Sequence, residues 1–456
     1  MFESLWRGAG CPEYLFLDTR PANHPVVLIT SHEMAEQITK ITKQQPYSTT
    51  KSKTVLEGLN QIIGRYSLLG EEGEAWKALR KQFNPGFAPA HILSLLPVII
   101  EKTYTFLDRL DATAASGMPT ELEPLCTNVT FDIIGEVVTN IDSKAQDPTL
   151  QGNDMVKNFR FLVDTYAGAS GVSFHWLNLP RQTKKYIYAK RLDAAIKSCI
   201  KDRWETMQTN GADKKDRSVL SLALKDLESL TPLGLQQIAD QVKTFLLAGH
   251  DTTSILLQRA IYALSIHPKC LKKIRVELDS IFGDADPKQV FLSHPDETVN
   301  SLVYTSAVIK ESLRLWPPAA SARMSHNGLR LRTSDGEEIC LDECVLYVIH
   351  SIIQRDPKVY GETANDFVPE RWLNESGNDN SIPISAWRAF ERGPRNCIGQ
   401  ELANLEAKVI LACVMRRYDF VKVGMGEAET DEKGHFVVDE KGRYKLKSEL
   451  LNVSVT

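Results

Sequence analysis

The chain has 456 residues, of which 43% are hydrophobic and 25% are charged, a composition typical of a globular protein with a sizeable core. Its formal net charge of −4 argues against nucleic acid as the main partner, because phosphate binding usually requires a basic excess. The eight cysteines are scattered without a CxxC pair, which excludes a dense disulfide framework and fits reduced thiols facing the cytosol.

The sequence predicts no transmembrane segment. Its most apolar run, residues 92–100, contains Pro97 and is far shorter than the roughly 20 residues needed to cross a bilayer. The N-terminal residues resemble neither a charged-then-apolar leader nor an anchor.

The predicted elements begin with a β-hairpin and continue as a long helical region. Residues 14–30 alternate and carry β-branched side chains around a proline turn, which indicates two paired strands. Ser31 is the expected N-cap of the first helix, with Glu33 in its first turn. Apolar spacing predicts helices over 31–42, 74–83, 91–110, 125–141, 184–208, 233–267, 303–316 and 397–417.

Polar loops separate these helices, and short strands return late in the chain. Loops are expected over 209–218, 282–297 and 373–381. Strands are expected near 328–349, a range that includes Cys340 and Cys344, and again at the C-terminus. The sequence therefore predicts a mainly α fold with small β-sheets in a single large domain.

The most unusual local sequence, FERGPRNCIG, surrounds Cys397. A helix beginning there places the sulfur near unpaired N–H groups and the positive end of the helix dipole, which lower a thiol pKa. Gly393 permits a close backbone approach, and Arg395 offers a cation two residues from the sulfur. These features suit a metal-ligating cysteine, but a lone cysteine is also commonly a small core residue. The residues alone leave both interpretations open.

The pattern F-x-x-G-x-R-x-C-x-G, met at Phe390, Gly393, Arg395, Cys397 and Gly399, resembles the haem-ligand loop of the cytochrome P-450 family. The resemblance extends along nearly the whole chain from about residue 14. It implies the cytochrome P-450 fold, haem b as cofactor, and Cys397 as the axial thiolate ligand of the iron. The other four motif residues are then expected to bind the cofactor.

A second motif, AGHDTT, lies inside the longest predicted helix. The Thr252 hydroxyl can bond back to the Ala248 carbonyl, which bends or opens the helix locally, and Gly249 leaves room beside that opening. In isolation these residues fit an ordinary helix surface better than a site. The family carries such an acid–alcohol pair over the haem, so the resemblance makes Asp251 and Thr252 the residues that deliver protons. His250 fills a variable position and receives no role.

Three arginines are expected to face the two haem propionates. Trp76 and Arg80 lie one turn apart on one predicted helix face, and the family binds a propionate with such a pair. Arg323 and Arg395 match further propionate-binding positions, and guanidinium pairs bidentately with carboxylate. As isolated residues, each would more often be a surface charge.

Another set of charged residues resembles a structural network of the family. Glu311 and Arg314 lie at i and i+3 on one helix, and Arg371 in PERW matches the third member of the family's buried Glu–Arg–Arg set. This set is expected to hold the core around the cysteine loop.

The sequence contains no G-x-G-x-x-G pattern and no flavin- or NADPH-binding segment. Electrons are therefore expected from a separate NADPH–cytochrome P-450 reductase. Lys77, Lys81, Arg388 and Arg392 are expected on the face where an acidic partner docks, although a run of charges is usually only a solvated face.

The resemblance implies a haem-thiolate monooxygenase, an oxidoreductase that inserts one atom of O2 into a lipophilic small molecule by hydroxylation or epoxidation. The segments RDPKVYG and PERW look most like fungal members, many of which act in secondary metabolism. Two alternatives stay open: an O2-independent isomerase or dehydratase, against which the acid–alcohol pair counts, and a catalytically silent haem binder. Apolar and small residues dominate the segments expected to contact the substrate, which are 49–69, 161–176, 245–253 and 319–322.

Both ends of the chain are expected to depart from the family pattern. Membrane-bound members begin with an anchor helix and a proline-rich hinge, which this sequence lacks, and a terminal hairpin is expected to be missing after residues 444–456. The resemblance implies the cytosolic face of the endoplasmic reticulum membrane, without a transmembrane segment in this chain. Residues 1–456 are expected to form one catalytic domain.

Overall fold

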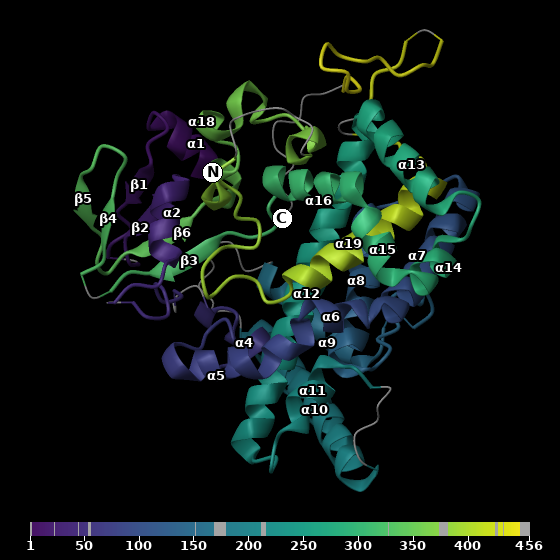
Figure 1. Ribbon diagram of the computed structural model, residues 1–456. Coiled ribbons are helices and arrows are strands. Elements are labelled where there is room, and N and C mark those ends of the chain that lie inside the picture. The colour runs from purple at the N-terminus through teal and green to yellow at the C-terminus, as the bar shows by residue number, and fades with distance from the viewer. Residues whose placement is uncertain are drawn as a thin grey trace. The chain divides into compact units, whose positions relative to one another are not determined.

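Figure 1 shows the computed structural model with its helices and strands labelled. The chain divides into two compact units, which are described separately below. The described residues are 2–21, 23–43, 45–52, 56–150, 152–167, 179–210, 216–326, 328–373, 382–424, 427–431 and 433–446. Unit 1 is drawn from Met1–Asn60, Ser67–Lys81 and Lys310–Gln400. Unit 2 is drawn from Gln61–Tyr66, Gln82–Ile309 and Glu401–Thr456.

Unit 1 contains the two small β-sheets. The first sheet has the spatial order β1 (Tyr14–Leu17), β2 (Val26–Ile29), β6 (Val345–Val348) and β3 (Ser321–Met324). The β1–β2 and β3–β6 pairs are antiparallel, whereas β2 and β6 are parallel. The second sheet pairs β4 (Arg330–Arg332) with β5 (Glu338–Cys340). The predicted hairpin and the strands near 328–349 are confirmed, whereas β3 was not predicted.

The helices of unit 1 are short. They are α1 (Phe2–Gly8), α2 (His32–Thr39), α17 (His350–Ile353), α18 (Pro357–Tyr360) and the 3-10 turns η3 (Gly361–Thr363), η4 (Pro369–Trp372) and η6 (Ile384–Ala386). Ser31 caps α2 as predicted, because its hydroxyl accepts from the Met34 N–H at 3.3 Å. Met34 and Ile38 then pack in one cluster with sheet residues such as Val27.

Four helices contain a boundary between the units. They are α4 (Asn60–Ile63), α5 (Gly73–Phe83), α16 (Val303–Leu315) and α19 (Gln400–Arg417). The last three confirm predicted helices.

The remaining described helices belong to unit 2. They are η1 (Asn84–Phe87), α6 (Pro89–Leu93), α7 (Leu96–Ser116), α8 (Leu122–Thr139), α9 (Asp154–Ala167), α10 (Leu179–Asn210), α11 (Val219–Lys225), α12 (Pro232–Ile266), α13 (Pro268–Phe282), α14 (Pro287–Ser293) and α15 (Pro295–Ser301). The mainly α fold with small sheets is therefore confirmed. No helix among the described ranges combines the length and the apolar character needed to cross a membrane.

Two predicted elements of unit 2 are wrong. The single helix expected over 91–110 is divided into α6 and α7, because Pro97 occupies the first turn of a new helix, where its missing N–H costs nothing. The loop expected over 282–297 contains α14, which Asp286 caps by accepting from the Lys288 N–H at 2.9 Å. The predicted loops at 209–218 and 373–381, and the strands at 444–456, lie largely outside the described residues.

Candidate functional site

Cys397 lies in a tight loop of unit 1, just before α19 begins. Its N–H donates to the Phe390 carbonyl at 2.9 Å, and the Asn396 N–H donates to the Gly393 carbonyl at 3.2 Å. The Gly399 N–H forms a hydrogen bond to the sulfur of Cys397. The loop thus brings four of the five predicted motif positions into one hydrogen-bonded turn.

Gly393 is a position where only glycine fits. Its backbone has φ +77°, and a Cβ atom there would lie 2.2 Å from the Thr39 carbonyl oxygen at the end of α2. Residues 354 positions apart therefore touch through bare backbone, which confirms the close approach that the sequence predicted.

The Cys397 sulfur is desolvated and yet accessible. Burial raises the pKa of the thiol, while the Gly399 N–H and the Arg80 charge act to lower it. The prediction of a lowered pKa is therefore wrong for the protein without cofactor, since desolvation outweighs the backbone donor. Residue Cys397 is nevertheless exposed. A metal ion at the sulfur would remove the thiol proton outright.

Arg80 on α5 holds the cysteine loop. Its Nη1 donates to the Asn396 carbonyl at 2.8 Å and its Nη2 to the Asn396 side-chain oxygen at 3.1 Å. Two donors of Arg80 are therefore used next to Cys397, and its contact with a propionate stays a prediction.

Trp76 and Arg395 come together through a cation–π contact. The guanidinium carbon of Arg395 lies 5.0 Å from the centroid of the Trp76 ring, and both side chains are buried. Arg395 also forms an ion pair with Glu72 and donates to the Glu71 carbonyl at 2.7 Å. Glu72 has no place in the sequence motif, so nothing pointed to this pairing.

Arg323 on β3 is fully buried with one donor unused. Its Nη1 donates to the Thr49 carbonyl at 3.0 Å and its Nε to the Ser321 hydroxyl at 3.3 Å. Among the described residues its Nη2 has no hydrogen-bond partner. Burial lowers the pKa of Arg323 to about 10. A buried guanidinium with a spare donor is a group that an anionic ligand would satisfy.

Lys51 is a second buried cation beside Arg323, and the sequence motifs gave no signal for it. The two residues form an antiparallel β-bridge, and the Lys51 Nζ lies 3.5 Å from the Ser321 hydroxyl. Desolvation, followed by the charges of Arg323 and Arg395, lowers the pKa of Lys51 to about 7. Its side chain is only half-buried, so Lys51, like Cys397, is desolvated yet accessible.

The predicted Glu311–Arg314–Arg371 network is confirmed. Arg314 donates to both Glu311 oxygens at 2.8 Å, and Arg371 donates to Glu311 at 3.0 Å. The Trp372 indole and the Val368 N–H, each at 2.9 Å, complete the carboxylate's partners. Glu311 and Arg314 are fully buried, so this network ties α16 to η4.

Arg388 does not lie on a docking face, which corrects the sequence prediction. It is fully buried and bonded to Glu36, Glu391 and the Thr39 hydroxyl. Arg392 shares Glu36 at 2.9 Å. The remaining two residues of the predicted set, Lys77 and Lys81, are exposed.

In unit 2, Thr252 makes the contact that the sequence predicts. Its hydroxyl donates to the Ala248 carbonyl at 2.6 Å. The helix α12 is continuous through this point, so the helix does not open there, and a local bend stays a prediction. The room expected beside Gly249 is filled, because a Cβ atom at that position would lie 2.5 Å from Ile134 of α8.

The helix α8 fixes α12 at this same turn. The Thr130 hydroxyl of α8 donates to the His250 carbonyl at 2.6 Å. One turn further along α12, the Thr127 and Ser254 hydroxyls lie 2.9 Å apart. Asp251 and Thr252 therefore lie in a stretch of α12 that is hydrogen-bonded to α8.

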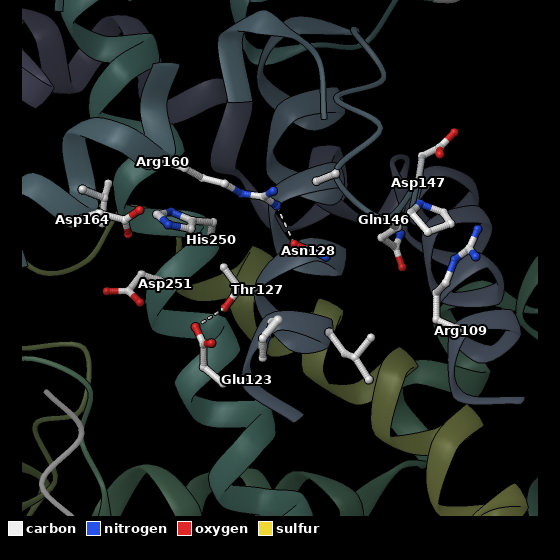
Figure 2. Close-up of a pocket in the computed structure, with 15 residues that line it drawn as sticks. Arg109, Glu123, Thr127, Asn128, Gln146, Asp147, Arg160, Asp164, His250 and Asp251 are labelled. Atoms are coloured by element: carbon white, nitrogen blue, oxygen red, sulfur yellow. Dashed lines mark hydrogen bonds between the residues drawn. The ribbon is translucent and has the colours of Figure 1, made fainter. Parts of the chain in front are cut away.

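Asp251 lines a polar pocket of about 570 Å³ within unit 2 (Figure 2). Helices α7, α8, α9 and α12 and the segment 145–148 supply its lining, which includes Arg109, Glu123, Asn128, Asp147, Arg160 and Asp164. Asp251 is exposed, whereas the adjacent His250 is buried. Burial lowers the pKa of His250, and its Nδ1 lies 2.8 Å from the Leu246 carbonyl, so we expect a neutral imidazole donating to that carbonyl at neutral pH.

The segments expected to contact the substrate are only partly described, since 53–55 and 168–176 lie outside the described residues. Phe245 is buried in the core of unit 2, with its ring centroid 5.3 Å from that of Phe83 and 5.0 Å from that of Phe87.

Unit 1 fits a haem with an axial cysteine. It presents the thiol of the exposed residue Cys397 and the indole of Trp76. It also presents two desolvated cations, Lys51 and Arg323, which have no carboxylate oxygen within 4.0 Å in the described part of the chain. A thiolate ligand, an aromatic contact and two cations match the iron, the ring edge and the two propionates of haem b.

The comparisons with known proteins agree with a haem site of this kind. A family model described as Cytochrome P450 matches residues 15–447. Cytochrome P450 monooxygenase acrF from Aspergillus aculeatus is 31% identical over 89% of this chain and 83% of its own. Cytochrome P450 monooxygenase polC from Polytolypa hystricis is 31% identical over 92% of this chain and 75% of its own. A crystal structure of the cytochrome P450DA heme domain has a TM-score of 0.76 and 18% identity, covering 98% of this chain and 90% of that one.

Proposed function

Because this chain belongs to the cytochrome P450 family, whose members hold haem b through a cysteine thiolate, we propose that Cys397 is the axial ligand of the haem iron. The family confirms the predicted class of haem-thiolate monooxygenase, an oxidoreductase that incorporates oxygen. The observation that carries the assignment to Cys397 is its accessible sulfur in a turn closed by Phe390, Gly393 and Gly399.

We assign the remaining cofactor contacts to Trp76, Arg80, Arg323 and Arg395. The spare Nη2 donor of Arg323 supports a bond to a propionate, and the buried Trp76–Arg395 stack supports a preformed wall for the ring edge. Bound haem supplies the iron at which O2 is reduced.

Asp251 and Thr252 are the proposed proton-delivering residues. The overall reaction takes a substrate C–H bond, O2, two electrons and two protons to an alcohol and water, so protons must reach the oxygen that leaves as water. Asp251 can exchange a proton with solvent, because it is exposed in a polar pocket. The Thr252 hydroxyl donates to the Ala248 carbonyl, which leaves its oxygen lone pairs to accept a hydrogen bond from water.

The family implies a redox partner, O2 and a lipophilic substrate. We further propose that the partner is an NADPH–cytochrome P450 reductase on a separate chain. Secondary metabolism is the proposed setting, supported by fungal relatives named as monooxygenases. The family model includes residues of both units, which supports a single catalytic domain.

The carbon monoxide difference spectrum of the reduced protein tests the iron ligand. Wild-type protein should give the thiolate band at about 450 nm, and Cys397→Ala should lose it. Cys340→Ala is the matched control, because Cys340 is also an exposed free cysteine, and it should keep the band. A band that survives in Cys397→Ala would overturn the assignment.

Turnover tests the reaction class. Lipophilic compounds that displace the axial water should be oxidised only when NADPH, reductase and O2 are all supplied. Conversion without O2 would favour an isomerase or dehydratase, and displacement without any conversion would favour a silent haem binder.

A further inference from the structure

We propose that Lys51 is a further haem-binding residue, which pairs with a haem propionate alongside Arg323. This inference rests on the proposed haem site and extends it to a residue that belongs to none of the sequence motifs.

The backbone fixes Lys51 beside Arg323. The residues form an antiparallel bridge, so the segment at 50–52 extends the sheet at the edge of β3. On either side of the bridge, the Met324 N–H donates to the Thr50 carbonyl at 2.9 Å and the Ser52 N–H donates to the Ala322 carbonyl at 3.4 Å. A group that binds Arg323 therefore has the Lys51 side chain as its neighbour.

The nearby carboxylates are already engaged by other donors. Glu72 pairs with Arg395 and also accepts from the Lys51 backbone N–H at 2.7 Å. Glu391 pairs with Arg388 at 2.6 Å and lies 3.3 Å from the His350 Nε2.

The side-chain ammonium of Lys51 is thus left without a counter-charge. Within the described ranges, neither Lys51 Nζ nor the Arg323 guanidinium has a carboxylate oxygen within 4.0 Å. Among the described residues, Nζ has one hydrogen-bond partner, the Ser321 hydroxyl, at the long distance of 3.5 Å. Two unpaired cations in a desolvated place are unfavourable until an anion arrives. A ligand with two carboxylates meets this need, and haem b carries two.

The pKa of Lys51 predicts how its contribution to haem binding changes with pH. Desolvation and the like charges of Arg323 and Arg395 lower the pKa of Lys51 to about 7, against smaller opposing effects of Glu391 and Glu72. A bound propionate raises this pKa. The contribution of Lys51 to haem binding is therefore complete below about pH 7 and is lost as pH rises through the higher pKa of the complex.

Haem loss from the holoprotein tests the role directly. With excess apomyoglobin as acceptor, Lys51→Met should release haem about 10- to 100-fold faster than wild type, the effect of one charged hydrogen bond. Lys43→Met, at an exposed lysine of the same unit, should release haem at the wild-type rate. Release from wild type should also quicken as pH rises above neutrality, and release from Lys51→Met should change less.

Haem dimethyl ester separates propionate pairing from a general structural effect. Both carboxylates of this cofactor are neutral, so wild type and Lys51→Met should release it at equal rates. If Lys51→Met released haem and the ester faster than wild type by the same factor, the proposal would be overturned.

In the haem-free protein, Lys51→Met should increase stability rather than weaken binding. Removing an unpaired charge beside two arginines should raise the denaturant midpoint of apo Lys51→Met above that of wild type. A lowered midpoint would show that Lys51 supports the fold and would overturn the proposal.

The two proposals fail in different ways. If Lys51→Met releases haem at the wild-type rate while Cys397→Ala loses the 450 nm band, only the Lys51 assignment falls. If Cys397→Ala keeps its band, the proposed iron ligand itself is wrong.

Discussion

The buried arginines of unit 1 differ in whether every guanidinium N–H group has a hydrogen-bond partner. Arg314 bonds to both Glu311 oxygens and to three backbone carbonyls, so nothing remains for a ligand. Arg388 is likewise saturated by groups of its own unit. Arg323 is equally buried, but its Nη2 has no hydrogen-bond partner in the described part of the chain. Because an unmet buried donor is costly, the first two arginines are structural, and the third is the one that we propose to bind a propionate.

Thr252→Ala should separate the chemistry of this hydroxyl from its place in the helix. We expect product formation to fall about 100-fold through loss of the hydroxyl oxygen that accepts from water and positions it for proton delivery, with the 450 nm band retained. Thr244→Ala is the matched control, because Thr244 makes the same 2.6 Å bond to a carbonyl four residues earlier in α12. Equal losses in both variants would assign the effect to the helix. Product yield per NADPH is the measurement.

Asp251→Asn should slow product formation about 100-fold, because the amide cannot pass on a proton. The solvent isotope effect on turnover should rise as proton delivery becomes rate-limiting. Asp164→Asn removes another exposed carboxylate from the same pocket and should change neither quantity. An Asp251→Asn enzyme with wild-type turnover would remove Asp251 from the mechanism.

At the scale of elements, α12 owes its position to contacts with α8. Gly249 admits Ile134, and hydroxyls of α8 bond to α12 within one turn on either side of Thr252. The acid–alcohol pair is thus positioned by a second helix more than one hundred residues earlier in the chain.

Gly249→Ala should lower the free energy of unfolding by about 1–3 kcal/mol, because its Cβ would overlap Ile134 at 2.5 Å. Ile134→Ala should relieve the overlap, so the double variant should lose less than the two single losses added together. Gly8→Ala is the control, since Gly8 is also helical but has no atom within 4 Å of an added Cβ. Urea unfolding provides the measurement, and additive losses would contradict the contact.

At the scale of the whole molecule, buried charges tie the stability of the protein to pH. Burial acts to raise the pKa of Glu391, but His350, Arg388 and Arg323 outweigh it and hold the pKa well below its usual range. A carboxyl with a lowered folded-state pKa stabilises the fold above its unfolded pKa, near 4.3, and loses that contribution as pH falls toward the folded value.

Unfolding free energies measured between about pH 7 and pH 3 should show this loss. Wild-type stability should fall steeply below about pH 5, whereas Glu391→Gln should be less stable at pH 7 and fall less steeply. Glu338→Gln, at an exposed residue, should reproduce the wild-type curve. Parallel curves for wild type and Glu391→Gln would refute a role for this carboxylate in acid unfolding.

Much of the fold and part of the site could be predicted because the signals are local. Helical spacing identified α5, α8, α10, α12, α16 and α19, and the Thr252–Ala248 bond follows from a separation of four positions in one helix. The errors arose where proline and capping chemistry mattered more than apolar spacing, as at α6, α7 and α14. The prediction that Arg388 lies on a docking face was wrong, because a basic residue in the sequence does not reveal whether its side chain is buried.

The family and the haem cofactor could be inferred from the sequence through its resemblance to the cytochrome P-450 family, because the cysteine motif lies within one short segment. Which charges lack a partner depends on the tertiary structure. The Gly393–Thr39 approach and the Lys51–Arg323 bridge each join residues hundreds of positions apart. Desolvation and charge pairing depend on such distant neighbours. For this reason the structure identifies Lys51 and Arg323 beside Ser321 as cations without a carboxylate partner among the described residues, and the sequence motifs could not.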